Sequence, residues 1–254
     1  ELAMIRDMAR EFAQQELLPR ATKHDRQGFI DPEVFQMMGD LGIWGLTVPE
    51  AYGGTEVGNL ALSLVLEEIN HACASTGVTA SVHGSLVCST LVKHAAFVIP
   101  RDTPGFTVGK SEKKTGLRGS STNELILDNV RLSKDRIVGE LNRGFHVAMD
   151  ALDGGRIGIA SQAVGIGRAC LEASVKYAKE REQFGKPIGQ FQAIQWKLAD
   201  MSTKLDASRM LTHKAAWMRD NGQDCGQMAS QAKLMSSITA NFCADECLQI
   251  HGGA

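Results

Sequence analysis

Three side chains that can bind a ligand stand at a break between two helical stretches of the sequence. The segment 176–201 reads KYAKEREQFGKPIGQFQAIQWKLADM, with Arg181, Gln183 and Phe184 directly before Gly185-Lys186-Pro187. A helix that stops at glycine and proline leaves its last backbone groups without intrahelical partners, and residues just before the stop can point away from a bundle. The break is therefore a candidate binding site.

Two further motifs combine an arginine with small or polar neighbours. Asp153-Gly154-Gly155-Arg156, expected at or near a helix start, could present a carboxylate and a bidentate donor to a ligand. A structural salt bridge is an equally good interpretation of that spacing. GLRGSST at 116–122 places a guanidinium and three hydroxyls in a turn between strands, where they could meet a carbonyl or phosphate or form an ordinary hydrogen-bonded turn.

Two pairs of residues have the spacing of metal ligands, but each pair could supply only half of a metal site. Glu68 and His71 have the separation used by di-iron bundles, which need two such pairs, and we interpret them as a charged pair where a helix reaches the surface. Cys243 and Cys247 are better explained as buried small residues than as half a zinc site. The six cysteines contain no CxxC pair, so we expect free thiols and no metal. The GxGxxG motif after a strand, GxxxxGK[ST] and GxSxG are absent.

Composition narrows the class of protein. The chain has 254 residues, 43% hydrophobic and 22% charged, with a formal net charge of -2 and a pI near 6.4. These values predict a globular protein without the basic field that attracts nucleic acid or an anionic membrane. The amino-acid sequence contains neither a membrane-spanning apolar run nor a signal peptide, so we expect a soluble protein inside the cell.

Hydrophobic periodicity divides the chain into three regions. Residues 1–94 predict an α-helical domain, with helices over 1–18, from Asp31-Pro32 to about Leu41, over 58–75 and over 75–94. Residues 95–140 hold three or four short β-prone runs and predict a partial middle β-domain. Residues 141–254 predict an incomplete C-terminal four-helix-bundle domain. The expected fold is mainly α with a residual β region.

Two features of this pattern are irregular. The change from helix at His94 to strand at Ala96 lacks the glycine, proline, asparagine or aspartate that marks such a switch, which suggests that a segment is missing. The helix from about Gly154 also contains five glycines, each costing about 1 kcal/mol relative to alanine. Close packing between helices explains that cost, and approach of a ligand is the alternative.

The order and spacing of six strings resemble the acyl-CoA dehydrogenase family, and within it the short-chain or butyryl-CoA branch. The resemblance covers nearly the whole chain. The strings are VPEAYGG (48–54), LVLEEINHACASTG (64–77), DTPGFTVGKSEKKTGLRGSSTNELILDNVRL (102–132), DGGRIGIASQAVGIG (153–167), KYAKEREQFGKPIGQFQAIQWKLADM (176–201) and LQIHGG (248–253).

This resemblance implies helical domains around a β-domain and a homotetramer that binds one FAD per subunit. It implies α,β-dehydrogenation of an acyl-CoA to the trans-2-enoyl-CoA in fatty acid β-oxidation, a part of lipid metabolism. A glutamate takes the α proton, the β hydrogen leaves as hydride to the flavin, and electrons pass to an electron-transfer flavoprotein. The cofactor carries the redox chemistry.

The resemblance also implies roles for individual residues. Arg181 corresponds to the partner of the FAD pyrophosphate of a neighbouring subunit, with Gln183, Phe184 and Gln192 beside the adenosine half. An arginine fork suits phosphate, and glycine lets a backbone come close. The acyl-CoA site corresponds to Asp153, Gly154, Gly155 and Arg156. Backbone amides that approach the FAD correspond to Gln249, Ile250, His251, Gly252 and Gly253.

This sequence departs from the family pattern in two places. A flavin-contacting stretch of the middle domain is absent between His94 and Ala95. The catalytic glutamate of most members lies beyond Ala254, and the position that holds the base in a minority of branches is Gly155 here. The catalytic residue is therefore unknown. Three other carboxylates have no family role, namely Glu67, Glu68 and Glu246.

Two other accounts of the sequence stay open. The chain could be a catalytically incompetent, truncated helical module that assembles or binds a partner, or a related flavin acyl-CoA oxidase that passes electrons to oxygen. The preference for short acyl chains rests on overall similarity. A bacterial cytoplasm and a mitochondrial matrix are both compatible with the sequence.

Overall fold

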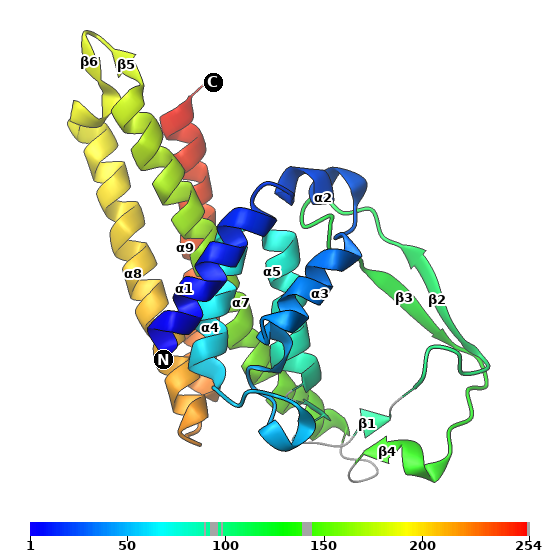
Figure 1. Ribbon diagram of the computed structural model, residues 1–254. Helices are drawn as coiled ribbons and strands as arrows, with labels where there is room; N and C mark the ends of the chain where they lie inside the picture. The colour runs from blue at the N-terminus through cyan, green and yellow to red at the C-terminus, as the bar shows by residue number, and fades with distance from the viewer. Residues whose placement is uncertain (89, 92–95, 98, 139–143, 253–254) are drawn as a thin grey trace.

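The computed structural model describes all residues except 89, 92–95, 98, 139–143 and 253–254, and shows a mainly helical protein with a small β region (Figure 1). The predicted fold class is confirmed. The switch at 94–95 lies outside the described residues. The helical elements before it are α1 (Leu2–Phe12), η1 (Ala13–Leu17), α2 (Ala21–Gln27), α3 (Pro32–Asp40), η2 (Ile43–Gly45), η3 (Glu50–Tyr52), α4 (Asn59–Ala72), α5 (Ala74–Ser81) and η4 (Val82–Cys88).

The first helices follow the predicted pattern with two local corrections. Helix α3 begins at Pro32 as expected, but the Asp31 carboxylate does not cap it. That carboxylate instead accepts hydrogen bonds from Lys23 and Gln27 at 2.7 and 3.0 Å. The break between α4 and α5 falls at Cys73, whose backbone is extended, and not at 75–77 as predicted.

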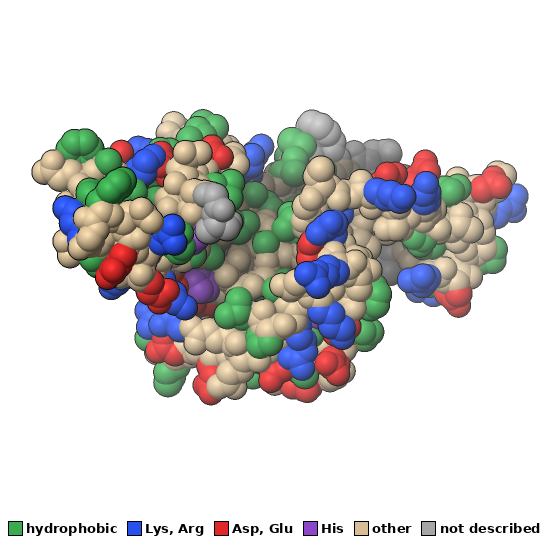
Figure 2. Space-filling model, turned by 90° about the horizontal axis from the view of Figure 1, so that it is seen from above, with side chains coloured by type: hydrophobic (Ala, Val, Ile, Leu, Met, Phe, Trp, Pro, Cys, Tyr) green, Lys and Arg blue, Asp and Glu red, His purple; other side chains and the backbone are tan. Residues whose placement is uncertain are grey.

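The β region consists of two antiparallel pairs. β1 (Ala96–Phe97) pairs with β4 (Ile137–Val138), and β2 (Phe106–Ser111) pairs with β3 (Asn123–Leu127) through a register shift. The β2–β3 pair projects from the side of the molecule (Figures 1 and 2). Leu125 and Leu127 are 62% and 58% exposed, so this hairpin lacks a packed face in the described structure. The predicted short strands are confirmed, and each pair forms a two-stranded sheet.

Three long helices make the C-terminal part of the described chain: α7 (Gly144–Glu180), α8 (Gln192–Asp220) and α9 (Gly226–His251). They lie side by side in Figure 1, and α4 packs against α7 and α8. Among the apolar side chains of α8, Met201, Leu205 and Ala215 are buried. Asp220 at the end of α8 accepts hydrogen bonds from the backbone N–H groups of Asn59 and Leu60, at 2.6 and 2.8 Å, and so caps α4.

The glycines of α7 allow close contact between helices. A Cβ on Gly165 would lie 2.5 Å from the backbone oxygen of Glu67 and 2.9 Å from Asn70 Cβ, both on α4. A hydroxyl pair, Ser63 on α4 and Ser161 on α7, lies 2.7 Å apart in the same buried seam. Helix packing therefore explains these glycines, as the simpler of the two interpretations proposed.

A buried ion-pair cluster joins four helices. Glu68 accepts hydrogen bonds from Arg10 of α1 at 2.8 Å and from Arg168 of α7 at 2.6 Å, and Glu67 accepts from Arg168 and from Arg209 of α8. Both carboxylates are less than 10% exposed. The interpretation of Glu68 and His71 as a pair at the surface is wrong, because Glu68 is buried among arginines.

Candidate active site

The predicted break is a β-hairpin at the end of the long helices. β5 (Glu182–Gln183) pairs with β6 (Lys186–Pro187), and Phe184 and Gly185 form the turn with φ of 55° and 78°. Positive φ at both central residues gives the twist that a two-residue hairpin needs. Phe184 is 89% exposed at the tip, and its ring meets the ring of Phe191 edge-on.

Arg181 directly precedes this hairpin and is exposed. Among the residues that the structure describes, no carboxylate lies within ion-pair distance of its guanidinium. Gln183 is also exposed, and Gln192 is the first residue of α8. The segment thus presents an uncompensated, permanently charged group and two exposed amides, a donor set that fits a phosphate.

The end of α9 lies at the same end of the bundle. The His251 ring stacks on Tyr177, near the end of α7, with centroids 4.3 Å apart. Gln249 is exposed, Ile250 is buried in the core, and Gly252 has a φ of 63° with open space where a Cβ would be. Gly253 lies outside the described residues. The structure therefore groups Arg181 and Gly252 at one end of the bundle, while their contact with FAD stays a prediction.

The motif 153–156 is not at a helix start, as the sequence suggested, but nine residues into α7. Helix α7 continues through Gly154 and Gly155, where η4 packs closely against its backbone. A Cβ on either would lie 2.9 Å from an atom of η4, Ser85 O or Leu86 Cδ2. Arg156 donates a hydrogen bond to Asp153, so the salt-bridge interpretation describes this pair.

A small cavity of about 220 Å³ adjoins this motif, between α5–η4 and α7. Gly155 and Arg156 are part of its wall, together with Ser81, Val82, Ser85, Leu86, Leu152, Ile159 and Lys233. The predicted substrate residues Gly155 and Arg156 thus line a largely apolar space that opens beside an arginine.

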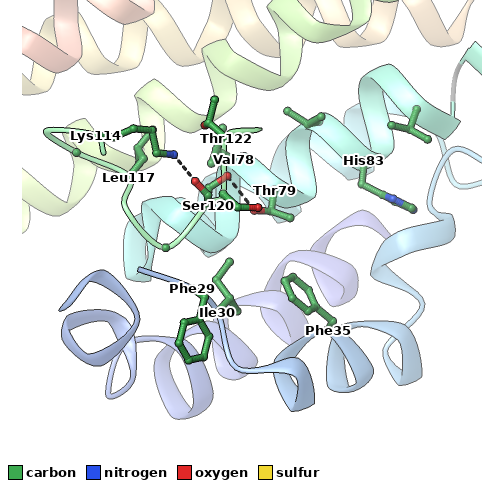
Figure 3. Close-up of a pocket in the computed structure, with 15 residues that line it drawn as sticks. Phe29, Ile30, Phe35, Val78, Thr79, His83, Lys114, Leu117, Ser120 and Thr122 are labelled. Atoms are coloured by element: carbon green, nitrogen blue, oxygen red, sulfur yellow. Dashed lines mark hydrogen bonds between the residues drawn. The ribbon is translucent and has the colours of Figure 1, made fainter. Parts of the chain in front are cut away.

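A larger cavity, of about 730 Å³, is shown in Figure 3, and Val82 is part of the wall of both cavities. Its walls come from the segment around α2 and α3, from α5–η4, and from the loop between β2 and β3. The lining residues are Phe29, Ile30, Phe35, Val78, Thr79, Val82, His83, Val87, Lys114, Gly116, Leu117, Gly119, Ser120, Ser121 and Thr122. Sequence reasoning identified only the 116–122 loop, because the α5 and α3 residues carry no local motif.

The 116–122 loop divides into a structural and an exposed part. Arg118 pairs with Asp25 of α2, an interaction that lowers the pKa of the Asp25 carboxyl. Thr79 Oγ1 lies 3.4 Å from Ser120 Oγ. Arg118 therefore anchors the turn, as the hydrogen-bonded interpretation predicted, and the following hydroxyls border the cavity.

Each of the three carboxylates without a family role is paired with a basic side chain. Glu67 and Glu68 belong to the ion-pair cluster, and Glu246 accepts a hydrogen bond from Lys197. We assign none of them as a catalytic base. All six cysteines are free thiols, as predicted, and the described part of the chain holds no group of three or more metal ligands.

Comparison with known proteins decides the family. Two family models match, the acyl-CoA dehydrogenase N-terminal domain over residues 1–96 and the acyl-CoA dehydrogenase C-terminal domain over residues 142–254. The chain belongs to the acyl-CoA dehydrogenase family. Members of this family are FAD-dependent oxidoreductases that act on a CH–CH bond.

Individual relatives of this acyl-CoA dehydrogenase agree with that assignment. It is 34% identical to the mouse short-chain specific mitochondrial acyl-CoA dehydrogenase, over 98% of this chain and 80% of that protein. The solved butyryl-CoA dehydrogenase of Megasphaera elsdenii matches 99% of this chain and 88% of its own, with 29% identity and a TM-score of 0.95. A chain in a structure titled as the electron transferring flavoprotein of Acidaminococcus fermentans matches 99% and 87%, with 31% identity and a TM-score of 0.94.

The alignment with the mouse enzyme is longer than this chain. It spans 330 positions, whereas this acyl-CoA dehydrogenase has 254 residues, so at least 76 aligned positions hold no residue of this chain. These missing positions lie within the matched span. They agree with the missing segment that is expected from the direct change from helix at His94 to strand at Ala96.

No helix in the described parts of the chain is both long and apolar enough to cross a membrane. Basic and acidic side chains are interspersed over the face shown in Figure 2, in keeping with the small net charge.

Proposed function

We propose that this protein catalyses the FAD-dependent α,β-dehydrogenation of a short-chain acyl-CoA to the trans-2-enoyl-CoA and passes the electrons to an electron-transfer flavoprotein. The observation that carries the proposal is the match to butyryl-CoA dehydrogenase over 99% of the chain at a TM-score of 0.95. The electron-transfer partner is supported by the similarity to a chain in an electron transferring flavoprotein structure. FAD, when bound, accepts the β hydrogen as hydride.

The cofactor residues are proposed from the geometry of the hairpin. The Arg181 guanidinium, without a carboxylate partner in the described structure, would hold the pyrophosphate, with Gln183, Phe184 and Gln192 beside it. Backbone amides at 249–253 would approach the same FAD. The cofactor would belong to a neighbouring subunit, because the β5–β6 hairpin lies at the far end of the long helices from α5 (Figure 1), whose residues line both cavities of its own chain.

The substrate residues are proposed from the small cavity. Asp153, Gly154, Gly155 and Arg156 would line the acyl-CoA site, and the small cavity beside Gly155 would take part of the acyl group. Its wall is mainly apolar, which excludes water from the reacting carbons.

Assembly, compartment and domain structure complete the proposal. We infer a homotetramer, because α8 and α9 expose large apolar side chains, including Trp196 (65%), Leu234 (62%) and Leu248 (69%).

A role in fatty acid β-oxidation, in a bacterial cytoplasm or a mitochondrial matrix, agrees with the relatives. We retain the division into domains at 1–94, 95–140 and 141–254.

Adding butyryl-CoA anaerobically to the purified, FAD-loaded protein tests the reaction. We expect the yellow flavin absorbance to bleach as the flavin is reduced, and reoxidation to follow when an electron-transfer flavoprotein is added. A protein that holds no flavin, or whose flavin is unchanged by butyryl-CoA, would contradict the proposal. Rapid reoxidation by oxygen with release of peroxide would instead identify an oxidase.

A further inference from the structure

Helices α7 and α9 run in the same direction, and both reach the end of the bundle that carries the β5–β6 hairpin (Figure 1). Two contacts fix their register. A Cβ on Gly167 of α7 would lie 3.6 Å from Cys243 Sγ of α9. Nearer the hairpin, the ring of Tyr177 on α7 stacks on His251 of α9 with centroids 4.3 Å apart. Residues of the two helices that lie between these contacts on the same faces therefore meet each other.

Cys170 and Cys247 meet in this register. Cys170 lies three residues beyond Gly167 and Cys247 lies four residues beyond Cys243, so each is on the same face of its helix and one turn nearer the hairpin. The two thiols are in hydrogen-bond contact and belong to one hydrophobic cluster. Both are half-buried, whereas Cys243 is completely buried. A small solute can therefore reach the facing pair without reaching Cys243.

His251 lies beside the Cys247 thiol. Its Nδ1 is 2.8 Å from the backbone oxygen of Cys247 and 3.7 Å from Cys247 Sγ. A carbonyl oxygen only accepts hydrogen bonds, so Nδ1 carries the proton, and this N–H favours negative charge on the neighbouring sulfur. Burial raises the pKa of Cys170 and of Cys243 to about 11, so both are protonated at pH 7. Cys247 is therefore the thiol of this cluster that reacts first with an oxidant.

We propose that Cys170 and Cys247 are an oxidation site for hydrogen peroxide and form a disulfide between α7 and α9 in the folded protein. The Cys247 thiolate attacks one peroxide oxygen, the O–O bond breaks, and Cys247 becomes a sulfenic acid. The hydroxide that leaves takes up the Cys247 proton. The Cys170 sulfur then attacks the Cys247 sulfur, the S–OH bond breaks, and the second hydroxide takes up the Cys170 proton. Two thiols and one peroxide thus give one disulfide and two water molecules.

The position of the pair gives the disulfide a structural consequence. Cys247 lies two residues before Gln249, where the segment proposed to approach FAD begins. The cross-link ties this end of α9 to α7 covalently, and a thiol reductant releases it. Attachment of the α9 end therefore becomes dependent on the redox conditions around the protein.

Peptide mass mapping tests the site. The reduced full chain is treated with hydrogen peroxide under native conditions until its mass stops changing, and the remaining thiols are then alkylated in urea. We expect alkylation of four of the six cysteines. We also expect one linked pair of peptides, which contains Cys170 and Cys247 and separates on reduction with dithiothreitol. The helical circular dichroism of the protein should be unchanged by the treatment.

Serine variants assign the order of the two steps. Cys247→Ser should abolish the linked peptides and leave Cys170 as a free thiol. Cys170→Ser should also abolish them, but it should leave a sulfenic acid at Cys247 that dimedone traps. Cys88→Ser is the matched control and should form the linked peptides like the unaltered protein. Cys88 is also half-buried, with a pKa raised by burial, but it lies on η4.

Six alkylated cysteines after peroxide treatment would overturn the proposal. A link that involves Cys243 would overturn it too, as would a sulfinic acid at Cys247 without a link. A link that forms only with loss of the helical signal would show that the folded protein does not bring the two sulfurs together. The measurement reads the state of the thiols and not flavin reduction or acyl-CoA binding, so each of these results leaves the proposed function standing.

Discussion

Glu68 shows how one buried carboxylate can hold several helices together. Burial by itself would raise the pKa of Glu68, but hydrogen bonds from Arg168 and Arg10 outweigh it and lower the pKa to about 2 from an ordinary 4.5. A carboxyl whose pKa is lowered by folding stabilises the protein above its unfolded pKa and loses that contribution as the pH falls through the folded value. The contribution of Glu68 is therefore complete near neutrality and is lost between about pH 5 and pH 2.

Replacing Glu68 by glutamine should lower the free energy of unfolding by about 3 kcal/mol at pH 7, because Arg10 and Arg168 then lose the buried carboxylate that both of them contact. Urea unfolding at pH 7 and at pH 3 measures this, and the difference from the unaltered protein should shrink at the lower pH. Glu11→Gln, on the exposed face of α1, is the control. An equal loss at both pH values would show that Glu68 contributes by shape and not by charge.

Arg181 is the residue on which the cofactor proposal depends. Removing a charge-assisted hydrogen bond to phosphate costs about 1.5 to 3 kcal/mol, so Arg181→Gln should weaken FAD binding by about tenfold or more. Fluorescence titration of the apoprotein with FAD measures the dissociation constant. Arg26→Gln removes an exposed arginine on α2 and should leave FAD affinity unchanged. If both variants bind FAD like the unaltered protein, the hairpin is not the pyrophosphate site.

At the scale of elements, the contact between α4 and α7 depends on glycine. Gly165→Ala would improve the intrinsic helix propensity by about 1 kcal/mol, but its methyl group would collide with the α4 backbone near Glu67. We expect a net loss of about 1 to 3 kcal/mol in the free energy of unfolding. Gly144→Ala, where a Cβ meets nothing within 4 Å, should not destabilise α7. Thermal and urea unfolding of both variants measure the difference, and a stabilised Gly165→Ala would show that the helices can separate without cost.

At the scale of the whole molecule, the exposed apolar faces of α8 and α9 predict association. One chain has a mass of 27.4 kDa, so a homotetramer has a mass of about 110 kDa, which light scattering after gel filtration resolves. Trp196→Glu should shift the population to smaller species, because it places a charge on that face. Tyr52→Glu, at a 77% exposed position of η3, is the control. A monomer at micromolar concentration would refute the tetramer, and with it the shared FAD site.

The sequence by itself determined the helices, the strands of the middle region and the break at 184–187. Each follows from local chemistry, since the 3.6-residue period, the β-prone runs and the Gly-Lys-Pro stop act within a few residues of chain. The break proved to be a hairpin because Phe184 and Gly185 adopt positive φ. The order of the sequence motifs along the chain also identified the family, which both family models confirm.

Only the tertiary structure decided which side chains meet. Glu68 pairs with Arg10 and Arg168, which are 58 and 100 residues away, and no local pattern specifies such partners. The motif at 153–156 lies within α7, with η4 packed closely against its glycines, whereas local propensity suggested a helix start there. His83 borders the larger cavity because three segments distant in the chain converge around it. Burial, charge pairing and cavity shape depend on every neighbour at once, so they arise only when the chain is folded.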